Sequence, residues 1–296
     1  MQPSNESILV SIIMPTFNRA GVILDTIESI RNQTYTKWEL IIADDGSEDN
    51  TKQLVENIRD PRILYLEFDH CGMGSRMKNF AIQRASGEQI AFIDSDDLWD
   101  PFKLEKQISA LQRFPDAGFC VTNGYNFMKP GLAIDHFYKQ KEGFRFGQLF
   151  IPYFQSELAG FTQALMVRKE CLEKIGGFKE DKSFSDVDCI IALAFDYPGL
   201  ILYEPLVYRR LHDSNHSSWS SDKNHNEGIA LIRQNANRLP ASVYNHALFR
   251  LHINNGEKFI RLGIRKIAVK NFVTAWKYSP LSLIPLRKLA KAFLKH

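Results

Sequence analysis

The first half of the chain alternates short apolar runs with stretches of helical period. Four runs rich in β-branched and aromatic residues predict strands, at residues 8–14, 38–43, 62–68 and 89–93. Between them lie segments with apolar residues on one helical face, for example Ile23, Ile27 and Ile30. Strict alternation of strand and helix predicts an α/β fold, with a mostly parallel central sheet covered by helices on both faces.

The second half is less regular and then becomes helical. Mixed strands and long loops are expected over residues 117–160. The sequence then predicts a strand at 161–167, helices at 168–178 and 185–195, and two short strands within 199–211. From about Asp222 the period is helical to the end, with breaks near Pro240 and Pro280. We therefore predict an α/β domain over residues 1–221 and a basic helical extension over 222–296.

Composition excludes several classes of protein. The 296 residues, 44% of them hydrophobic, can bury a sizeable core. The four cysteines lack CxxC spacing, so neither a zinc site nor a disulfide framework is predicted. The polar N-terminus has no signal-peptide core, and no run approaches the roughly 20 apolar residues that span a bilayer. These features predict a cytoplasmic protein.

The net charge of +3 conceals an asymmetry along the chain. No acidic residue follows Glu257, whereas ten basic residues do: Lys258, Arg261, Arg265, Lys266, Lys270, Lys277, Arg287, Lys288, Lys291 and Lys295. An acidic body therefore ends in a basic tail. No nucleic-acid-binding motif accompanies this charge, so no nucleic acid partner is predicted.

The last predicted helix is amphipathic, and two interpretations of it stay open. One face carries Leu286, Leu289, Ala290, Phe293 and Leu294, and the opposite face carries Arg287, Lys288, Lys291 and Lys295. A basic amphipathic helix of this kind can lie on an anionic membrane surface, which would make the protein peripheral on the inner face of the cytoplasmic membrane. The same helix can instead pack on the body of the protein with its basic face in solvent.

Polar clusters follow three of the predicted strands: "PTFNR" after the first, "DDGSEDNT" after the second and "DSDD" after the fourth. In an open parallel sheet these loops emerge at one edge, where ligands bind. The first two clusters are also typical of ordinary turns, and in the second one Gly46 would supply the positive φ. The third gathers Asp94, Asp96 and Asp97, whose mutual repulsion favours a divalent cation, Mg²⁺ or Mn²⁺, and with it a nucleotide diphosphate.

Three segments carry a resemblance to a known family: "VSIIMPTFNRAGVILDTIESIRNQTYTKWELIIADDGSEDNT", "GEQIAFIDSDDLWDPFKLEKQ" and "LEKIGGFKEDKSFSDVDCIIAL". Their order and spacing resemble those of family 2 glycosyltransferases of the bacterial surface-polysaccharide type. The resemblance covers residues 8–212. It implies the GT-A fold, a Rossmann-like fold shared by enzymes that use nucleotide-diphospho-sugars.

The resemblance also implies roles for residues that match the family's motifs. Pro15 and Thr16 correspond to positions that touch the nucleotide, and Asp45 to the acid that hydrogen-bonds its base. Lys78 stands where many relatives carry an arginine, so its phosphate contact would lack a bidentate fork.

The "DSDD" cluster corresponds to the family's metal motif, with Mn²⁺ or Mg²⁺ as the implied cofactor. Asp96 would approach the ribose and the metal, Asp97 would hold the metal, and Asp94 would shape the loop. His212 matches a position near the diphosphate and the metal. Asp186 matches the second acid of the family's catalytic pair, with Ser185 in place of the first, so Asp186 is the predicted general base.

Together these assignments imply a metal-dependent, inverting glycosyltransferase. Its partners would be a nucleotide-diphosphate sugar donor and a saccharide or lipid-linked acceptor, in the synthesis of a cell-surface polysaccharide. Two alternatives stay open from the residues. A nucleotidyltransferase could use the same scaffold and metal site, although "PTFNR" is a poor phosphate loop. A non-catalytic sugar-nucleotide-binding protein could keep both acidic loops.

Overall fold

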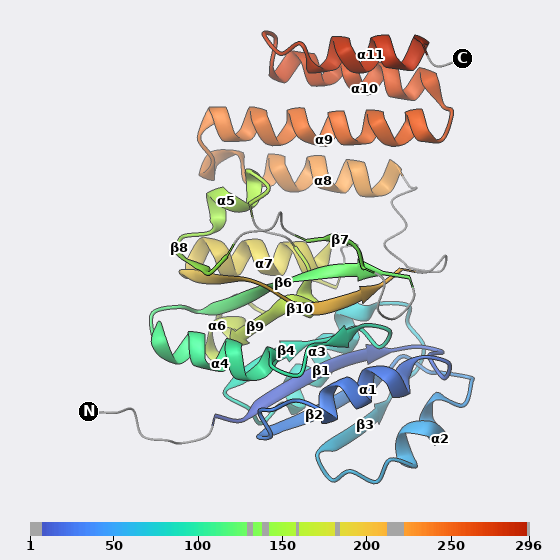
Figure 1. Ribbon diagram of the computed structural model, residues 1–296, viewed down its shortest axis with the longest axis vertical. Helices are drawn as coiled ribbons and strands as arrows, with labels where there is room; N and C mark the ends of the chain where they lie inside the picture. The colour runs from blue at the N-terminus through green and yellow to red at the C-terminus, as the bar shows by residue number, and fades with distance from the viewer. Residues whose placement is uncertain are drawn as a thin grey trace. The chain divides into compact units, whose positions relative to one another are not determined.

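The computed structural model of the chain describes residues 8–128, 133–137, 142–157, 160–180, 184–211 and 222–294 (Figure 1). The chain divides into two compact units. The sheet unit comprises Met1–Phe150 and Leu158–Asn215. The helical unit comprises Ile151–Glu157 and His216–His296.

A single sheet organises the sheet unit. Its strands within the described residues are β1 Val10–Thr16, β2 Trp38–Asp44, β3 Ile63–Glu67, β4 Gln89–Phe92, β5 Leu98–Trp99, β6 Phe119–Phe127, β7 Ala133–His136, β8 Phe144–Gly147, β9 Leu165–Arg168 and β10 Gly199–Arg210. Their order is β3-β2-β1-β4-β9-β6-β10-β5, with β7 paired to β6 and β8 to β10. The β2–β3, β1–β2, β1–β4 and β6–β10 pairs are parallel. The prediction of a mostly parallel α/β sheet is confirmed.

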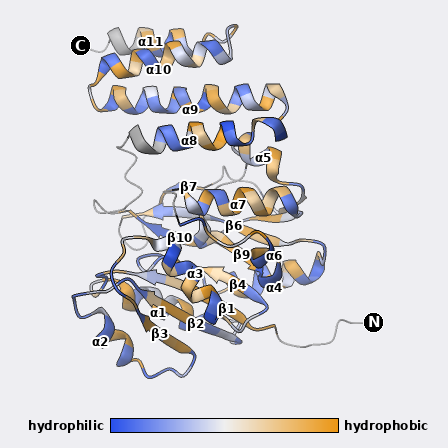
Figure 2. Ribbon diagram, turned by 180° about the vertical axis from the view of Figure 1, so that it is seen from behind, coloured by the Kyte–Doolittle hydropathy of each residue, from blue (hydrophilic) through white to orange (hydrophobic). Residues whose placement is uncertain are grey.

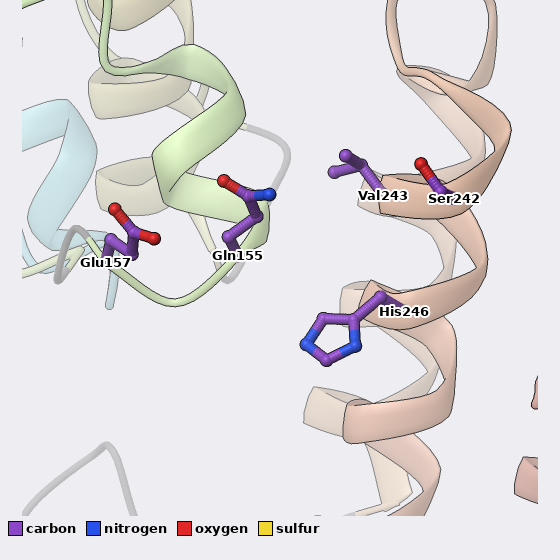
Figure 3. A pocket seen from close by; sticks show the side chains of 5 residues that line it. All are labelled: Gln155, Glu157, Ser242, Val243 and His246. Carbon is purple, nitrogen blue, oxygen red and sulfur yellow. The ribbon is translucent and has the colours of Figure 1, made fainter. Parts of the chain in front are cut away.

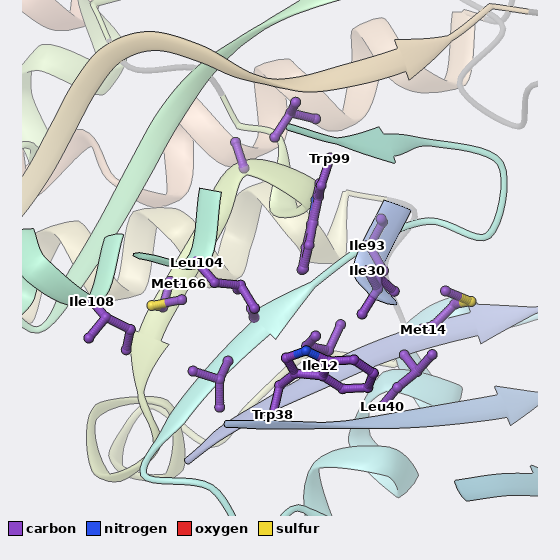
Figure 4. Close-up of a cluster of buried hydrophobic side chains, with 14 of the residues drawn as sticks. Ile12, Met14, Ile30, Trp38, Leu40, Ile93, Trp99, Leu104, Ile108 and Met166 are labelled. Carbon is purple, nitrogen blue, oxygen red and sulfur yellow. The ribbon is translucent and has the colours of Figure 1, made fainter. Parts of the chain in front are cut away.

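Helices cover both faces of this sheet. They are α1 Ile23–Arg31, α2 Thr51–Glu56, α3 Gly74–Arg84, α4 Lys103–Arg113, α6 Lys169–Lys174 and α7 Ser185–Asp196, whereas α5 Phe150–Phe154 belongs to the helical unit from Ile151 onward. Apolar side chains of α1 and α4 share one core cluster with alternate residues of β1 and β2, such as Ile12 and Leu40 (Figure 4), and α4 itself packs on β6 and β10. Helix α3 packs on β1 and β2 from the other side (Figures 1 and 2).

Two predicted strands differ from the structure. Residues 199–210 form one strand, β10, because two register shifts around Pro205 absorb the break that was expected there. Proline lacks the N–H that a regular ladder needs, and the irregularity lets pairing resume beyond it. The stretch expected as a strand at 161–167 begins as a 3₁₀ turn, η1 Thr162–Ala164, before β9 starts at Leu165.

The helical unit is built from α8 Asp222–Gln234, the 3₁₀ turn η2 Ala236–Arg238, α9 Ala241–Arg261, α10 Arg265–Tyr278 and α11 Ile284–Leu294. The breaks near Pro240 and Pro280 are confirmed, and a further one occurs at Gly263, whose φ is +74°. Apolar and polar turns alternate along α9 (Figure 2). Phe249, Phe259 and Phe272 form the core of this unit.

The predicted apolar face of the last helix is divided in the structure. Leu289 packs against the core of the helical unit, whereas Leu286 is exposed. The backbone is described as far as Leu294, but the side chains of Lys291 and the residues after it lie outside the described part of the chain. Leu289 thus follows the second interpretation, in which the helix packs on the protein. Within the described part of the chain, no helix has both the length and the apolar character that crossing a bilayer requires.

Candidate active site

The loop after β2 is a tight turn that holds the Asp45 carboxylate. Gly46 has the expected positive φ, +75°, and a Cβ there would lie 3.0 Å from the backbone nitrogen of His70. The buried Asp45 carboxylate accepts hydrogen bonds from the backbone nitrogens of Cys71 and Gly72, each at 2.8 Å. His70 Nδ1 lies 3.1 Å from the same carboxylate. Asp45 therefore orders the loop after β3, and its contact with a base stays a prediction.

The "PTFNR" loop lies against this turn. The Asn18 backbone nitrogen donates to Ser47 Oγ at 2.8 Å, and the Asn18 side chain accepts from the Glu48 backbone nitrogen at 2.8 Å. Thr16, adjacent to the half-buried Pro15, is buried, and its hydroxyl has no hydrogen-bond partner within the described residues. A buried hydroxyl left unpaired costs about 1–3 kcal/mol. A ligand that bonded Thr16 would remove that cost.

A hollow of about 530 Å³ adjoins the same turn. Its lining residues are Gly46, Ser47, Glu67, Phe68, Asp69 and His70. The His70 ring stacks on the Phe17 ring, with the centroids 4.3 Å apart. A stacked aromatic pair beside carboxylates and backbone amides suits a flat, polar-edged ring such as a nucleobase.

The "DSDD" loop turns one of its aspartates inward. Asp97 is buried, and its Oδ1 accepts from the Arg210 backbone nitrogen at 2.8 Å while its Oδ2 accepts from Gln163 Nε2 at 3.0 Å. Burial raises the pKa of Asp97, and the charges of Asp94 and Asp96 raise it further. Both oxygens of Asp97 thus already hold the loop to distant parts of the chain. Its role as a metal ligand stays a prediction.

The other two aspartates form a crowded acidic pair. Asp94 is half-buried and Asp96 is buried. Burial raises the pKa of Asp94 to about 6, because the opposing charge of Lys78 offsets it only in part and Asp96 and Asp186 add to it. Arg19 Nε lies 3.7 Å from Asp96 Oδ2. Carboxylate oxygens crowded in this way fit a small divalent cation.

Asp186 lies in the first turn of α7 and faces Lys78. The Lys78 Nζ is 2.7 Å from Asp186 Oδ1, and Thr162 Oγ1 donates to Asp186 Oδ2 at 3.0 Å. Burial lowers the pKa of Lys78, but the charges of Asp186 and Asp94 outweigh it and hold that pKa above its ordinary value. The predicted base is therefore ion-paired with the predicted phosphate ligand.

The η1 turn joins these two parts of the site. Thr162 bonds Asp186, and the next residue, Gln163, bonds Asp97. The sequence did not single out either residue, because the apolar run "FTQALMV" pointed to a strand. The polar pair Thr162 and Gln163 inside this apolar run could have indicated a site residue.

Two arginines at the end of β10 complete the site, and both were missed from the sequence. Arg210 Nε donates to the Asp96 backbone oxygen at 2.9 Å. Arg209 is buried with its guanidinium 4.9 Å from the Phe161 ring centroid. Both belong to "YRRL", where a basic pair ends an apolar run, and this pattern could have indicated a charged ligand.

One predicted metal ligand cannot be placed. His212 lies outside the described residues, one position beyond Leu211. Within the described ranges, no three His, Cys, Asp or Glu side chains converge as a metal site. A cation at the "DSDD" loop would therefore draw on one or two carboxylates from those ranges.

A second hollow, of about 410 Å³, lies in the helical unit (Figure 3). Its lining residues are Gln155, Glu157, Ser242, Val243 and His246. Gln155 and Glu157 lie across the hollow from the three residues of α9. One carboxylate and one imidazole are too few ligands for a metal site, so we assign no metal to this hollow.

Comparison with known proteins identifies the class. The model of the family described as Glycosyl transferase family 2 matches residues 11–176, more than half of the chain. The chain belongs to this family. This membership favours the glycosyltransferase interpretation over the nucleotidyltransferase alternative.

Curated bacterial glycosyltransferases are similar to parts of the chain. The chain is 46% identical, over 35% of its length, to the UDP-Glc:alpha-D-GlcNAc-diphosphoundecaprenol beta-1,3-glucosyltransferase WfgD of Escherichia coli, and spans 41% of that protein. It is 36% identical, over 44% of its length, to the putative teichuronic acid biosynthesis glycosyltransferase TuaG of Bacillus subtilis, and spans 52% of it. The match thus covers about half or less of each of these relatives.

Solved structures share the fold. TarS 1-349 of S. aureus in complex with UDP-GlcNAc superposes with a TM-score of 0.70 at 16% identity, covering 97% of this chain and 89% of that one. The mannosyltransferase PcManGT of Pyrobaculum calidifontis, in complex with GDP-Man and Mn²⁺, gives 0.61 at 20% identity, covering 95% and 78%. The predicted GT-A fold is confirmed.

Proposed function

We propose that this chain transfers a sugar, with inversion, from a uridine diphosphate sugar to a hydroxyl of a lipid-linked saccharide. The donor class is supported by the name of WfgD and by the UDP-GlcNAc complex of TarS. The observation that carries the proposal is the η1 turn, which joins the metal-type acidic loop to Asp186 through Gln163 and Thr162. Glycosyl transfer needs a base for the acceptor hydroxyl close to a group that stabilises the charge of the leaving diphosphate. A carboxylate cluster suited to a cation, linked through one turn to a separate carboxylate, meets both needs.

Asp186 is the base in this proposal. It takes the proton of the acceptor hydroxyl while that oxygen attacks the anomeric carbon from the face opposite the diphosphate. The bond from that carbon to the diphosphate breaks, and the diphosphate leaves with the electron pair. Because a carboxylate paired with an ammonium is a weak base, we expect the Lys78–Asp186 contact of 2.7 Å to loosen when the donor's negative charge reaches Lys78.

Mn²⁺ or Mg²⁺ fits the oxygen donors of the acidic loop. We assign Asp96 and Asp97 as its first ligands, and the hydrogen bonds from Gln163 and the Arg210 backbone orient the Asp97 carboxylate. When bound, the cation supplies charge neutralisation for the leaving diphosphate. Arg19, 3.7 Å from Asp96, adds a fixed positive charge to the same end of the site.

A lipid-linked acceptor would bring the enzyme to the inner face of the cytoplasmic membrane. The name of WfgD describes a diphosphoundecaprenol acceptor, and the basic tail of this chain has the charge to meet an anionic membrane. The polysaccharide pathway of TuaG supports a role in cell-surface polymer synthesis.

The direct test is nucleotide release from a panel of nucleotide sugars, with Mn²⁺ or with EDTA. We expect the pure protein to hydrolyse one UDP-sugar slowly in the presence of Mn²⁺. Asp186→Asn should lower hydrolysis and transfer by about 100-fold or more, since base catalysis contributes that much, and leave UDP affinity nearly unchanged. Asp196→Asn, at the exposed far end of the same helix, is the matched control and should behave as wild type.

Two outcomes would contradict the proposal at different points. Near-normal turnover by Asp186→Asn would remove Asp186 as the base. Tight UDP binding with no release from any nucleotide sugar would instead favour the non-catalytic sugar-nucleotide-binding protein.

A further inference from the structure

The turn between α10 and α11 exposes a group of large apolar side chains. We call it the α10–α11 apolar patch, and its members are Trp276, Leu281, Leu283, Ile284 and Leu286. Leu281 is 98% exposed and Leu283 60% exposed. Isolated apolar residues on a surface need no explanation, but several grouped on one turn and the helix ends beside it are typical of an interaction site.

Hydrogen bonds hold this turn in a defined shape. Trp276 Nε1 donates to the Pro280 backbone oxygen at 2.6 Å, which ties the turn to α10. The Ser282 backbone nitrogen donates to the Ser279 oxygen at 3.1 Å, and Ser282 Oγ accepts from the Ile284 nitrogen at 3.3 Å. The leucines are therefore presented by an ordered turn, so docking them would require little loss of conformational entropy.

The charge around the patch is of one sign. Lys277 follows Trp276 and Arg287 follows Leu286, and both are exposed. No acidic residue occurs after Glu257, and Glu257 is itself ion-paired with Lys288. Apolar side chains among exposed basic ones complement a surface with an anionic face over a hydrocarbon interior.

We propose that the α10–α11 apolar patch inserts into an anionic lipid bilayer, with Leu281 and Leu283 in the acyl region and Lys277 and Arg287 at the headgroups. Trp276 suits the boundary between the two, where indole rings are enriched. The inference rests on the proposed function, because a lipid-linked acceptor requires the enzyme at a membrane. It differs from the amphipathic-helix interpretation, since Leu289 of α11 is engaged in the core of the helical unit.

The test is sedimentation of the full chain with vesicles. We expect binding to phosphatidylethanolamine–phosphatidylglycerol vesicles, weakening with salt, and little binding to phosphatidylcholine. The double variant Leu281→Ser/Leu283→Ser should lower the partition coefficient by about tenfold or more, because two apolar side chains no longer insert. Lys277→Gln/Arg287→Gln should also lower it and reduce its dependence on salt.

Leu262→Ser is the matched control. Leu262 is 53% exposed in the same unit, but it belongs to the α9–α10 connection, outside the patch, and this variant should bind as wild type. Equal loss in Leu262→Ser, or unchanged binding in the double serine variant, would overturn the inference. A third result would also overturn it: wild-type protein that does not bind the vesicles and elutes as a dimer in size-exclusion chromatography, with the double serine variant eluting as a monomer. The patch would then join two copies of the chain.

Donor hydrolysis in solution separates this inference from the proposed function. The double serine variant should hydrolyse the UDP-sugar at the wild-type rate, since the patch lies outside the residues assigned to catalysis. Vesicle binding without any hydrolysis would count against the proposed function alone. Hydrolysis without vesicle binding would count against the patch alone.

Discussion

At the scale of single residues, burial divides roles that the sequence leaves equal. Asp94, Asp96 and Asp97 are the same residue type within four positions, and in the structure both oxygens of Asp97 accept hydrogen bonds, from Gln163 and from the Arg210 backbone. Those partners are far away in the chain. The sequence could therefore locate the acidic cluster, whereas the direction of each carboxylate depends on the tertiary contacts.

Lys103 provides a prediction about pH at this scale. The side chain is fully buried, with its Nζ 2.7 Å from Gln107 Oε1 and 3.8 Å from the Trp99 ring centroid. Burial lowers the pKa of Lys103 to about 7. Above that pH the unfolded chain binds more protons than the folded one, so the free energy of unfolding should rise with pH, by at most about 1.4 kcal/mol per unit. This stability is lost as the pH falls toward about 7, and the dependence levels off below that pH, where the folded and unfolded chains both carry the proton.

Urea denaturation between about pH 6.5 and 8.5, below the ordinary pKa of a thiol, measures this slope. Lys103→Met should remove the slope and stabilise the protein at neutral pH. Lys106→Met, on the exposed side of the same helix, should retain it. An unchanged slope in Lys103→Met would show that Lys103 is not the titrating group.

At the scale of elements, period and turn residues predict most of the fold. The strands at residues 10–16, 38–44, 63–67 and 89–92 differ from the predicted ones by two residues or fewer at either end. The predicted elements are wrong where the local sequence pattern and the tertiary contacts favour different backbone structures. The "FTQALMV" run becomes a 3₁₀ turn plus a strand, and β10 passes through Pro205 because neighbouring β6 continues alongside it.

Gly256 tests the packing of two elements. It lies in α9, and a Cβ there would be 2.4 Å from Cε1 of the buried Phe272 on α10. Gly256→Ala should lower the free energy of unfolding of the helical unit by about 1–3 kcal/mol through overpacking, despite the better helix propensity of alanine. Hydrogen exchange of peptides from α9 and α10 would measure the change.

Gly228→Ala is the control for that substitution. Gly228 lies in α8, where a Cβ would meet only the methyl groups of Leu251, the nearest at 3.2 Å. A flexible side-chain end can yield, so the change should be neutral or stabilising by up to about 1 kcal/mol. Equal protection in Gly256→Ala and wild type would mean that α9 and α10 are not closely packed there.

At the scale of the whole molecule, the site assembles from segments spread over nearly 200 residues. Thr16 ends β1, Asp45 and Asp96 follow β2 and β4, Asp186 lies in the first turn of α7, and Arg210 ends β10. A nucleotide and a cation bound among them should stabilise the fold by linkage. A ligand at about 100 times its Kd contributes about 2.7 kcal/mol.

UDP with Mn²⁺ should therefore raise the Tm of the full chain by about 5 °C or more. UDP with EDTA, or Mn²⁺ alone, should raise it much less, since the acidic loop and the diphosphate each need the cation. Differential scanning fluorimetry measures the shift, and Asp96→Asn should abolish the added effect of Mn²⁺. An equal shift by UDP in EDTA would remove the cation from the nucleotide site.

The sequence by itself determined the alternation of strand and helix, the mostly parallel sheet and the loops that carry charge, because backbone period and turn chemistry are local properties. It also determined the family, through motifs in a fixed order. Only the tertiary structure decided that Lys78 pairs with Asp186, that η1 joins Asp186 to the acidic loop and that the α10–α11 turn exposes its leucines. Such pairings depend on which distant residues the fold brings within a few ångströms and which it leaves in solvent.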